Sequence, residues 1–183
     1  MKNKTIIIWL KIIKSFQNAI DDNDGNQHLD YNALHNLSYM EKVVKESFRA
    51  WPVSFIERNC TKAYTIPGTN VTIPEGCMVQ LAGNRVMQNE EFYPNPGEFD
   101  PDLHFDSDVL VPSTFLTFGQ GPRNCIGMRF AWTIMRSFLF RLLANYKVLP
   151  GPGLKKTIDI DPKSPQALPK GGVHVRLEKR TES

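Results

Sequence analysis

The chain has 183 residues, of which 41% are hydrophobic, and its formal net charge is +3. This length indicates one domain with enough apolar residues for a core, and the small charge gives no indication of nucleic-acid binding. The three cysteines, Cys60, Cys77 and Cys125, are widely spaced and odd in number. They exclude a C-x-x-C motif and do not indicate a disulfide framework.

Residues 1–20 predict an amphipathic helix. Apolar residues recur at helical spacing across this segment, whereas Lys11 and Lys14 lie off the apolar stripe. Lys11 interrupts the apolar run too early for a secretory signal, and the run is far too short to cross a bilayer. We therefore expect neither a signal nor a membrane anchor in this chain.

A second helix is expected over residues 37–51. Ser38 is followed three residues later by Glu41, which is the pattern of a capping box. Pro52 marks the end of the helix, because the residue before a proline avoids helical dihedral angles.

Residues 63–81 contain short β-type runs separated by proline and glycine, which predict a small β-meander. Residues 94–117 are rich in Pro, Asp, Asn and Phe without periodicity and predict a long loop. A structureless loop of this length in a compact domain usually has a function.

The last predicted helix covers residues 127–146 and is apolar on nearly all sides apart from Arg129, Arg136 and Arg141. A helix of this kind is typically buried on most sides. The alternating residues 172–178 predict a strand near the end of the chain.

The glycine-rich bend over residues 118–127 places Cys125 just before this helix. The bend is no dinucleotide fingerprint, which would need glycine at Asn124, and no phosphate-binding P-loop, because Met128 and Arg129 replace its Lys-Ser or Lys-Thr. A thiolate at a helix N-terminus is stabilised by free N–H groups and by the helix dipole. Three roles are open for the thiol: a nucleophile, a metal ligand or a small buried apolar group.

The bend and the start of the helix follow the spacing F-x-x-G-x-R-x-C-x-G-x-x-x-A, whose members are Phe118, Gly121, Arg123, Cys125, Gly127 and Ala131. This spacing resembles the haem-binding signature of the cytochrome P-450 superfamily, and the sequence FGQGPRNCIGMRFA is similar to the microsomal, animal-type version of that signature. The resemblance runs from about residue 14 onward but covers only the C-terminal part of the family pattern. It implies one partial domain over 1–183, mainly α with a small β-meander, forming the proximal, haem-cysteine side of the family's fold.

The resemblance implies haem b, iron protoporphyrin IX, as the cofactor and Cys125 as the thiolate ligand of its iron. Arg123 would pair with a haem propionate, and Phe118 would shield the sulfur from water. Arg58 falls where a second propionate-binding arginine often lies in the family. The residues expected to contact the haem are therefore Phe118, Gly121, Arg123, Gly127, Ala131 and Arg58.

Glu46 and Arg49 match the family's E-x-x-R helix motif, and their spacing puts both on one face of the helix. We expect a structural pair rather than catalytic groups. The family usually reads Pro-Glu-Arg-Phe in the following loop, whereas residues 101–105 are one residue longer and lack arginine. His104 is the candidate for the missing third partner. By the same resemblance, residues 53–56 would lie at the substrate edge of the haem.

The implied reaction is insertion of one oxygen atom from O2 into an apolar small molecule, with electrons from NADPH through a reductase. Lys42, Lys45 and Arg129 are candidate contacts for that reductase. The full-length parent would be anchored on the cytosolic face of the endoplasmic reticulum membrane. No segment resembles the family's long distal helix with its acid–alcohol pair, so no catalytic residue is expected here. The alternative is a truncated, non-catalytic haem-binding or structural remnant of such an enzyme.

Overall fold

The computed structural model describes residues 2–22, 30–52, 56–106, 112–153, 159–163 and 168–180. Its α-helices are α1 (Lys2–Asp21), α2 (Tyr31–His35), α3 (Ser38–Ala50), α4 (Gly83–Val86), α5 (Pro101–Phe105) and α6 (Met128–Asn145). Two 3-10 turns are η1 (Pro112–Thr114) and η2 (Gly121–Arg123). The strands are β1 (Ile56–Asn59), β2 (Tyr64–Thr65), β3 (Thr72–Ile73), β4 (Met78–Leu81), β5 (Tyr146–Pro150) and β6 (Val175–Lys179).

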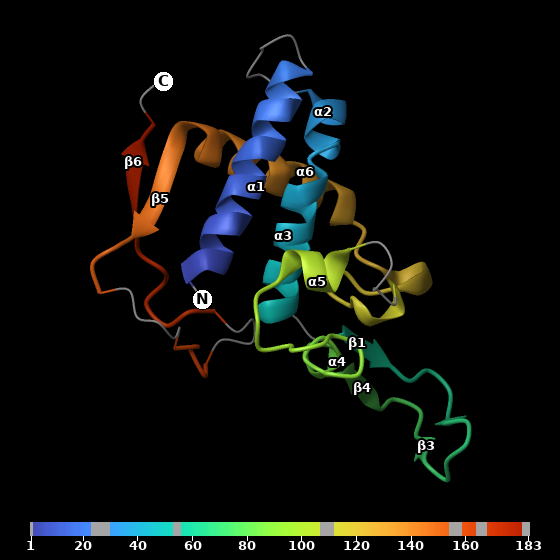
Figure 1. Ribbon diagram of the computed structural model, residues 1–183. Coiled ribbons are helices and arrows are strands. Elements are labelled where there is room, and N and C mark those ends of the chain that lie inside the picture. Colours follow the sequence, from blue (N-terminus) through green and yellow to red (C-terminus); the bar gives the residue numbers. More distant parts are fainter. Residues whose placement is uncertain are drawn as a thin grey trace.

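The main core lies where α1, α3 and α6 meet (Figure 1). Ile12 and Phe16 supply the buried face of α1, and the ring of Phe16 meets that of Phe140 edge to face at 5.0 Å between centroids. Met40 and Val44, one helical turn apart, supply the buried face of α3. Each such side chain contributes about 1.5–3 kcal/mol when it leaves water, so the three helices hold one another in place.

The start of α3 differs from the sequence prediction. Leu37 is the N-cap residue, and no side chain caps the helix, so the predicted capping box at Ser38 is wrong. Leu37 is buried in the main core, which means that apolar packing fixes where the helix begins. Glu41 instead accepts hydrogen bonds from Lys45, at 2.8 Å, and from Arg136.

The helix α6 is covered on one side only, so the expectation that residues 127–146 are buried on most sides is wrong. Arg136 and Phe140 face the core. Phe130, Ile134 and Phe138 recur every four residues and are 72%, 50% and 62% exposed. No other described element lies over this apolar stripe.

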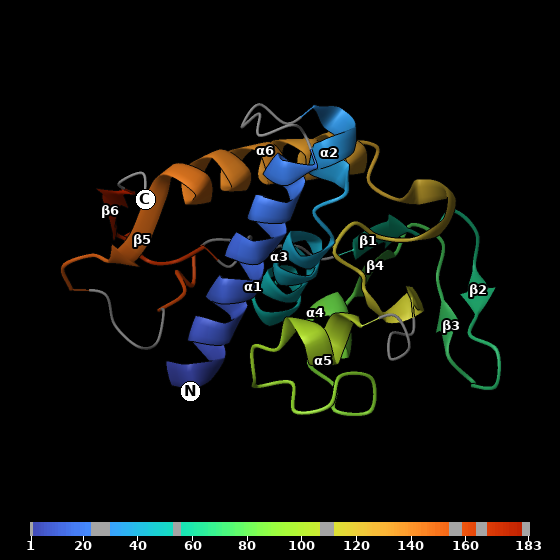
Figure 2. The same ribbon diagram turned by 45° about the horizontal axis from the view of Figure 1, so that its top comes forward.

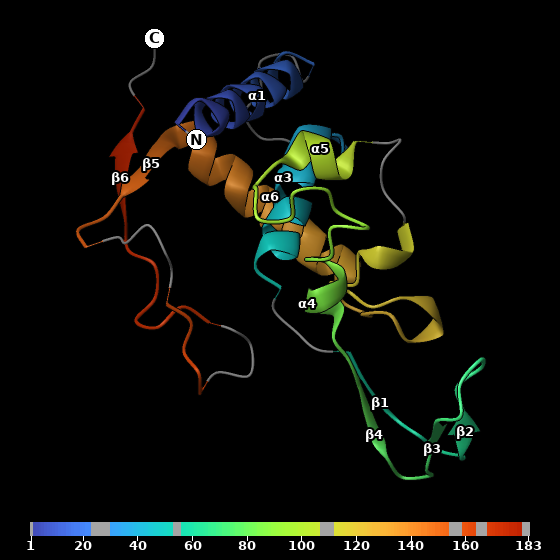
Figure 3. The same ribbon diagram turned by 60° about the horizontal axis from the view of Figure 1, so that its bottom comes forward.

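The strands form small antiparallel sheets, which agrees with a mainly α fold with little β-structure. The predicted meander over residues 63–81 is wrong, because β4 pairs with β1 and not with β3. β1 pairs with β4 and β2 with β3, so the β2–β3 hairpin is nested within the β1–β4 pair. Figure 3 shows this ribbon extending away from the helices. β5 follows α6 directly and pairs with β6.

The predicted long loop over residues 94–117 is not structureless, because it contains α5 and η1. The carboxylate of Asp100 accepts a hydrogen bond from the Leu103 N–H, and Pro101 occupies the first turn of α5. An aspartate before such a proline is a strong helix-start signal. Local capping therefore starts a helix here, although the segment has no apolar periodicity.

Glu46 and Arg49 form a fully buried ion pair, each 0% exposed. Arg49 Nε and Nη2 donate to the two carboxylate oxygens of Glu46 at 2.6 and 2.9 Å. His104 Nδ1 lies 3.0 Å from Glu46 Oε1, and His104 Nε2 lies 2.7 Å from the carbonyl oxygen of Pro94. The two ring nitrogens thus connect Glu46 on α3 with the backbone at Pro94.

The same pair ties α3 to the segment that follows the β-ribbon. The Arg49 guanidinium also donates to three backbone carbonyls, those of Met87 (3.2 Å), Pro96 (2.9 Å) and Glu98 (3.0 Å). The backbone N–H of Asp100 donates to Glu46 Oε1 at 2.8 Å. Every contact crosses from α3 to residues 87–104, so this cluster is the main polar link between the two regions.

We predict that Arg49→Ala is strongly destabilising. The substitution leaves the Glu46 carboxylate buried without its main partner, and breaking a buried pair costs about 3–5 kcal/mol. The free energy of unfolding, measured by urea denaturation, checks this. Lys11→Ala is the matched control, because the Lys11–Asp102 pair at 2.7 Å is largely exposed and such pairs contribute about 0–1 kcal/mol. Equal losses in the two variants would contradict a structural role for the buried pair.

We also predict that Glu46 makes stability dependent on acid pH. Burial alone raises the pKa of Glu46, but hydrogen bonds from His104, Arg49 and the Asp100 N–H, with the charge of Arg49, lower it below its usual 4.5. A lowered pKa stabilises the fold above the unfolded-state pKa, and this stabilisation is lost as pH falls through the folded-state value. The unfolding free energy should therefore decline on acidification below about pH 4.5, and less steeply in Glu46→Gln. If Asp102→Asn flattened the profile as much as Glu46→Gln, the effect would not belong to Glu46.

Candidate functional site

Cys125 lies in a closed bend between η2 and α6, and its side chain is exposed. The Cys125 N–H donates to the Phe118 carbonyl at 2.8 Å, which closes the bend across seven residues. Gly119 and Gly121 have φ of +69° and +75°, a region that favours glycine because a Cβ is crowded there. The two glycines therefore allow the turn that brings Phe118 and Cys125 together.

The thiol lies at the N-terminal end of α6. Gly127 is the N-cap residue, and the Met128 N–H donates to the Cys125 carbonyl at 3.3 Å. Gly127 has φ of −84°, so its backbone does not require glycine, and a Cβ there would make an ordinary 4.0 Å contact with Cys125 Sγ. A helix N-terminus favours negative charge, which suits a thiolate at this place.

The ring of Phe118 is held between α3 and α6. Its centroid lies 5.6 Å from that of Phe48 on α3 and 5.9 Å from that of Trp132 on α6. Phe48 and Trp132 are themselves 6.3 Å apart. The three rings make an aromatic triangle that joins the cysteine bend to both helices.

Arg58 and Arg123 come together beside the bend, where the segment carrying Cys125 passes close to β1 (Figure 2). Arg58 Nη2 donates to the backbone carbonyl of Arg123 at 3.1 Å, and Nη1 donates to the carbonyl of Glu57 at 2.7 Å. Both arginine side chains are exposed. The Arg58 guanidinium therefore lies against the backbone of the cysteine bend, and the Arg123 side chain is exposed on the same bend.

Apolar side chains are exposed next to the thiol. Ile126 is 104% exposed and Phe130 is 72% exposed, while Ala131 is half-buried on the first turns of α6. A soft thiolate suits iron, guanidinium groups bind carboxylates, and an apolar rim suits a flat apolar ring. The residues present therefore fit a haem.

The other predicted site residues fall into three groups: the structural cluster, the docking cations and the substrate edge. Glu46, Arg49 and His104 contact one another in the buried cluster. Phe48 lies between Glu46 and Arg49 on α3. Among the candidate docking cations, Lys42 pairs with Asp106 at 3.1 Å and Lys45 with Glu41 at 2.8 Å. Arg129 is exposed. Of the expected substrate edge, residues 53–55 lie outside the described residues, and Ile56 begins β1.

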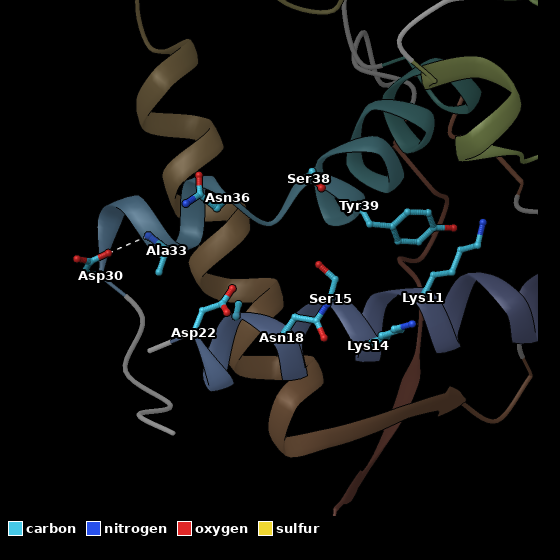
Figure 4. Close-up of a pocket in the computed structure, with 11 residues that line it drawn as sticks. Lys11, Lys14, Ser15, Asn18, Asp22, Asp30, Ala33, Asn36, Ser38 and Tyr39 are labelled. Atoms are coloured by element: carbon cyan, nitrogen blue, oxygen red, sulfur yellow. Dashed lines mark hydrogen bonds between the residues drawn. The ribbon is translucent and has the colours of Figure 1, made fainter. Parts of the chain in front are cut away.

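A hollow lies away from the cysteine bend, between α1, α2 and the start of α3, with a volume of about 610 Å³. Figure 4 shows that its lining is mostly polar, with Lys11 and Lys14 towards one end and Asp22 and Asp30 towards the other. Lys11 is engaged by Asp102 and lies 5.4 Å from the centroid of the Tyr39 ring. The lining contains no residue of the cysteine bend, so this hollow is not part of the candidate haem site.

Sequence reasoning missed the roles of Phe48 and Trp132. Neither residue is a fixed position of a motif: Phe48 lies between Glu46 and Arg49, and Trp132 follows the last fixed position of the haem signature, Ala131. The only signal in the sequence was that both positions carry large aromatic rings. Whether the two rings meet depends on how α3 and α6 cross, which the sequence does not give.

Within the described residues, no helix combines the length and hydrophobicity that spanning a membrane requires.

The family model for cytochrome P450 matches residues 10–174. Similar proteins include cytochrome P450 6B1 of Papilio polyxenes, 35% identical over 173 residues, covering 93% of this chain and 34% of the relative. Cytochrome P450 9e2 of Blattella germanica is 35% identical over 167 residues, covering 89% and 31%. The chain thus spans about a third of the length of the curated relatives it matches. With the match extending through α1, α3, the cysteine bend and α6, the chain belongs to the cytochrome P450 family.

Proposed function

We propose that this chain is the C-terminal, proximal part of a haem-thiolate monooxygenase and that Cys125 is the ligand of the haem b iron. The observation that carries the proposal is the exposed Cys125 thiol at the start of α6, in a bend closed by the Phe118 carbonyl. When bound, the thiolate-ligated haem supplies O2 activation, because the sulfur donates electron density that favours O–O cleavage.

The residues around Cys125 bind and orient this cofactor in the proposal. Arg58 and Arg123 pair with the two propionates, and the hydrogen bond from the Arg58 guanidinium to the Arg123 backbone carbonyl, which holds Arg58 at the bend, supports this assignment. Gly121 and Gly127 keep side chains away from the macrocycle, and Ala131 lets α6 pass close to it. Phe118 covers the bend from the side of α3 and α6 and limits the access of water to the sulfur.

The complete enzyme would insert one oxygen atom from O2 into an apolar small molecule with electrons from NADPH through a reductase. Arg129 is the best-placed docking cation, since Lys42 and Lys45 are engaged by acidic residues of this chain. The complete protein would be anchored at the endoplasmic reticulum membrane and face the cytosol. Glu46, Arg49 and His104 would support the fold without taking part in the chemistry.

A second candidate is a haem-binding protein that does not turn over substrate. The exposed stripe Phe130, Ile134 and Phe138 favours it, because the described residues leave this apolar face of α6 open to water. Oxygen activation needs positioned proton donors in a site that excludes water. We propose that residues 1–183 bind haem but do not couple O2 activation to substrate oxidation by themselves.

We predict that haem-loaded protein shows the red-shifted Soret band of thiolate ligation in its ferrous–CO spectrum. Cys125→Ser should abolish this band, because an alcohol cannot replace the thiolate as an electron donor to iron. Cys60→Ser and Cys77→Ser are matched controls and should leave the band unchanged. A band that survives Cys125→Ser would refute the ligand assignment.

The choice between the two candidates is decided by turnover. Purified residues 1–183 loaded with haem and supplied with a reductase, NADPH and lipophilic substrates should consume NADPH and release peroxide rather than oxidised product. Product and peroxide are measured together, and a reaction without protein gives the background. Product formation matched to NADPH consumption would show that the chain is a competent monooxygenase by itself.

A further inference from the structure

Arg136 is a buried cation whose position the haem signature does not explain. It is the buried member of the three arginines of α6, whereas Arg129 and Arg141 are exposed. Its Nη2 donates to the carboxylate of Glu41 on α3, and its guanidinium carbon lies 5.3 Å from the centroid of the Trp132 ring. A buried cation is costly unless it is paired, and these two contacts offset part of that cost.

Glu41 is suited to hold this cation. Burial alone raises the pKa of Glu41, but the hydrogen bond from Lys45 and the charges of Lys45, Arg136 and His35 together lower it. The carboxylate therefore stays ionised at neutral pH and fixes the Arg136 guanidinium against α3. The planar guanidinium can hydrogen-bond at its edge and stack on an aromatic face at once.

The contacts continue from Arg136 to the thiol. Trp132 lies between Arg136, at 5.3 Å, and Phe118, at 5.9 Å between ring centroids. The backbone carbonyl of Phe118 in turn accepts the Cys125 N–H at 2.8 Å. Each step is a direct contact, and both ring partners that Phe118 has among the described residues, Phe48 and Trp132, belong to the aromatic triangle.

We propose that Arg136 and Trp132 are positioning residues for Cys125: Glu41 holds Arg136, Arg136 holds the Trp132 ring, and Trp132 fixes Phe118 and with it the backbone that presents the thiol. Neither residue touches the thiol itself. The effect on the backbone stands on this geometry alone, whereas an effect on iron ligation rests on the proposed function.

The test is residue-resolved hydrogen exchange of the chain without haem. Arg136→Met keeps an apolar stem but removes the cation, and Trp132→Leu removes the ring. Both should speed exchange at the Cys125 N–H by roughly tenfold or more, because its acceptor is no longer held in place. The Cys60 N–H, which donates to the Cys77 carbonyl at 2.8 Å in the β-ribbon, should exchange as before.

Three further variants separate positioning from general stability. Arg141→Met is the matched control, since Arg141 is an exposed arginine on the same helix, and it should leave both amides unchanged. Arg136→Lys and Trp132→Phe retain a cation and a ring, so they should keep slow exchange at Cys125. Equal acceleration at Cys125 and Cys60, or no acceleration at Cys125, would overturn the proposal.

The ferrous–CO spectrum of haem-loaded protein then tests the extension to iron. Arg136→Met and Trp132→Leu should lose part of the thiolate-type band, and Arg136→Lys should restore it. If the wild-type chain shows no such band, the proposed function fails, while the exchange data still decide whether these residues position Cys125. A full thiolate-type band in both variants would overturn the extension to iron.

Discussion

The buried pair of Glu46 and Arg49 is the interaction on which the candidate site depends. Two ions withdrawn from water are stable only when each remaining donor and acceptor is satisfied, and here His104 and four backbone groups complete the set. The pair fixes α3 against residues 87–104. Phe48 lies between Glu46 and Arg49 on α3. The buried pair therefore also fixes Phe48, which is one corner of the aromatic triangle that contacts the cysteine bend.

The helix α6 serves two functions through two faces. Its inner face places Phe140 in the main core, Arg136 against Glu41 and Trp132 against Phe118. Its outer face exposes Phe130, Ile134 and Phe138 in a stripe that starts in the first turn of α6 and runs away from Cys125. The inner face thereby keeps the start of the helix, where Cys125 lies, in a fixed position.

The sequence predicted the features that depend on short-range chemistry. The cysteine bend could be recognised because its glycines and its cysteine stand at fixed positions, and Gly121 indeed has a left-handed conformation. The wrong predictions concern features that depend on tertiary contacts. Ser38 was predicted to cap its helix, but burial of Leu37 in the core makes Leu37 the N-cap residue. The burial of residues 127–146 depends on which elements cover them, and the sequence does not show this. The short helix α5 was not predicted, although Asp100 and Pro101 form a typical N-cap and first helical residue.

The central claim is that Cys125 supplies the sulfur ligand of a haem iron, and X-ray absorption at the iron edge tests it most directly. Chain loaded with haem and compared with the Cys125→Ser variant should show one sulfur neighbour of the iron that the variant lacks. Only nitrogen and oxygen neighbours in the wild-type chain, or a sulfur neighbour that persists in Cys125→Ser, would contradict the account.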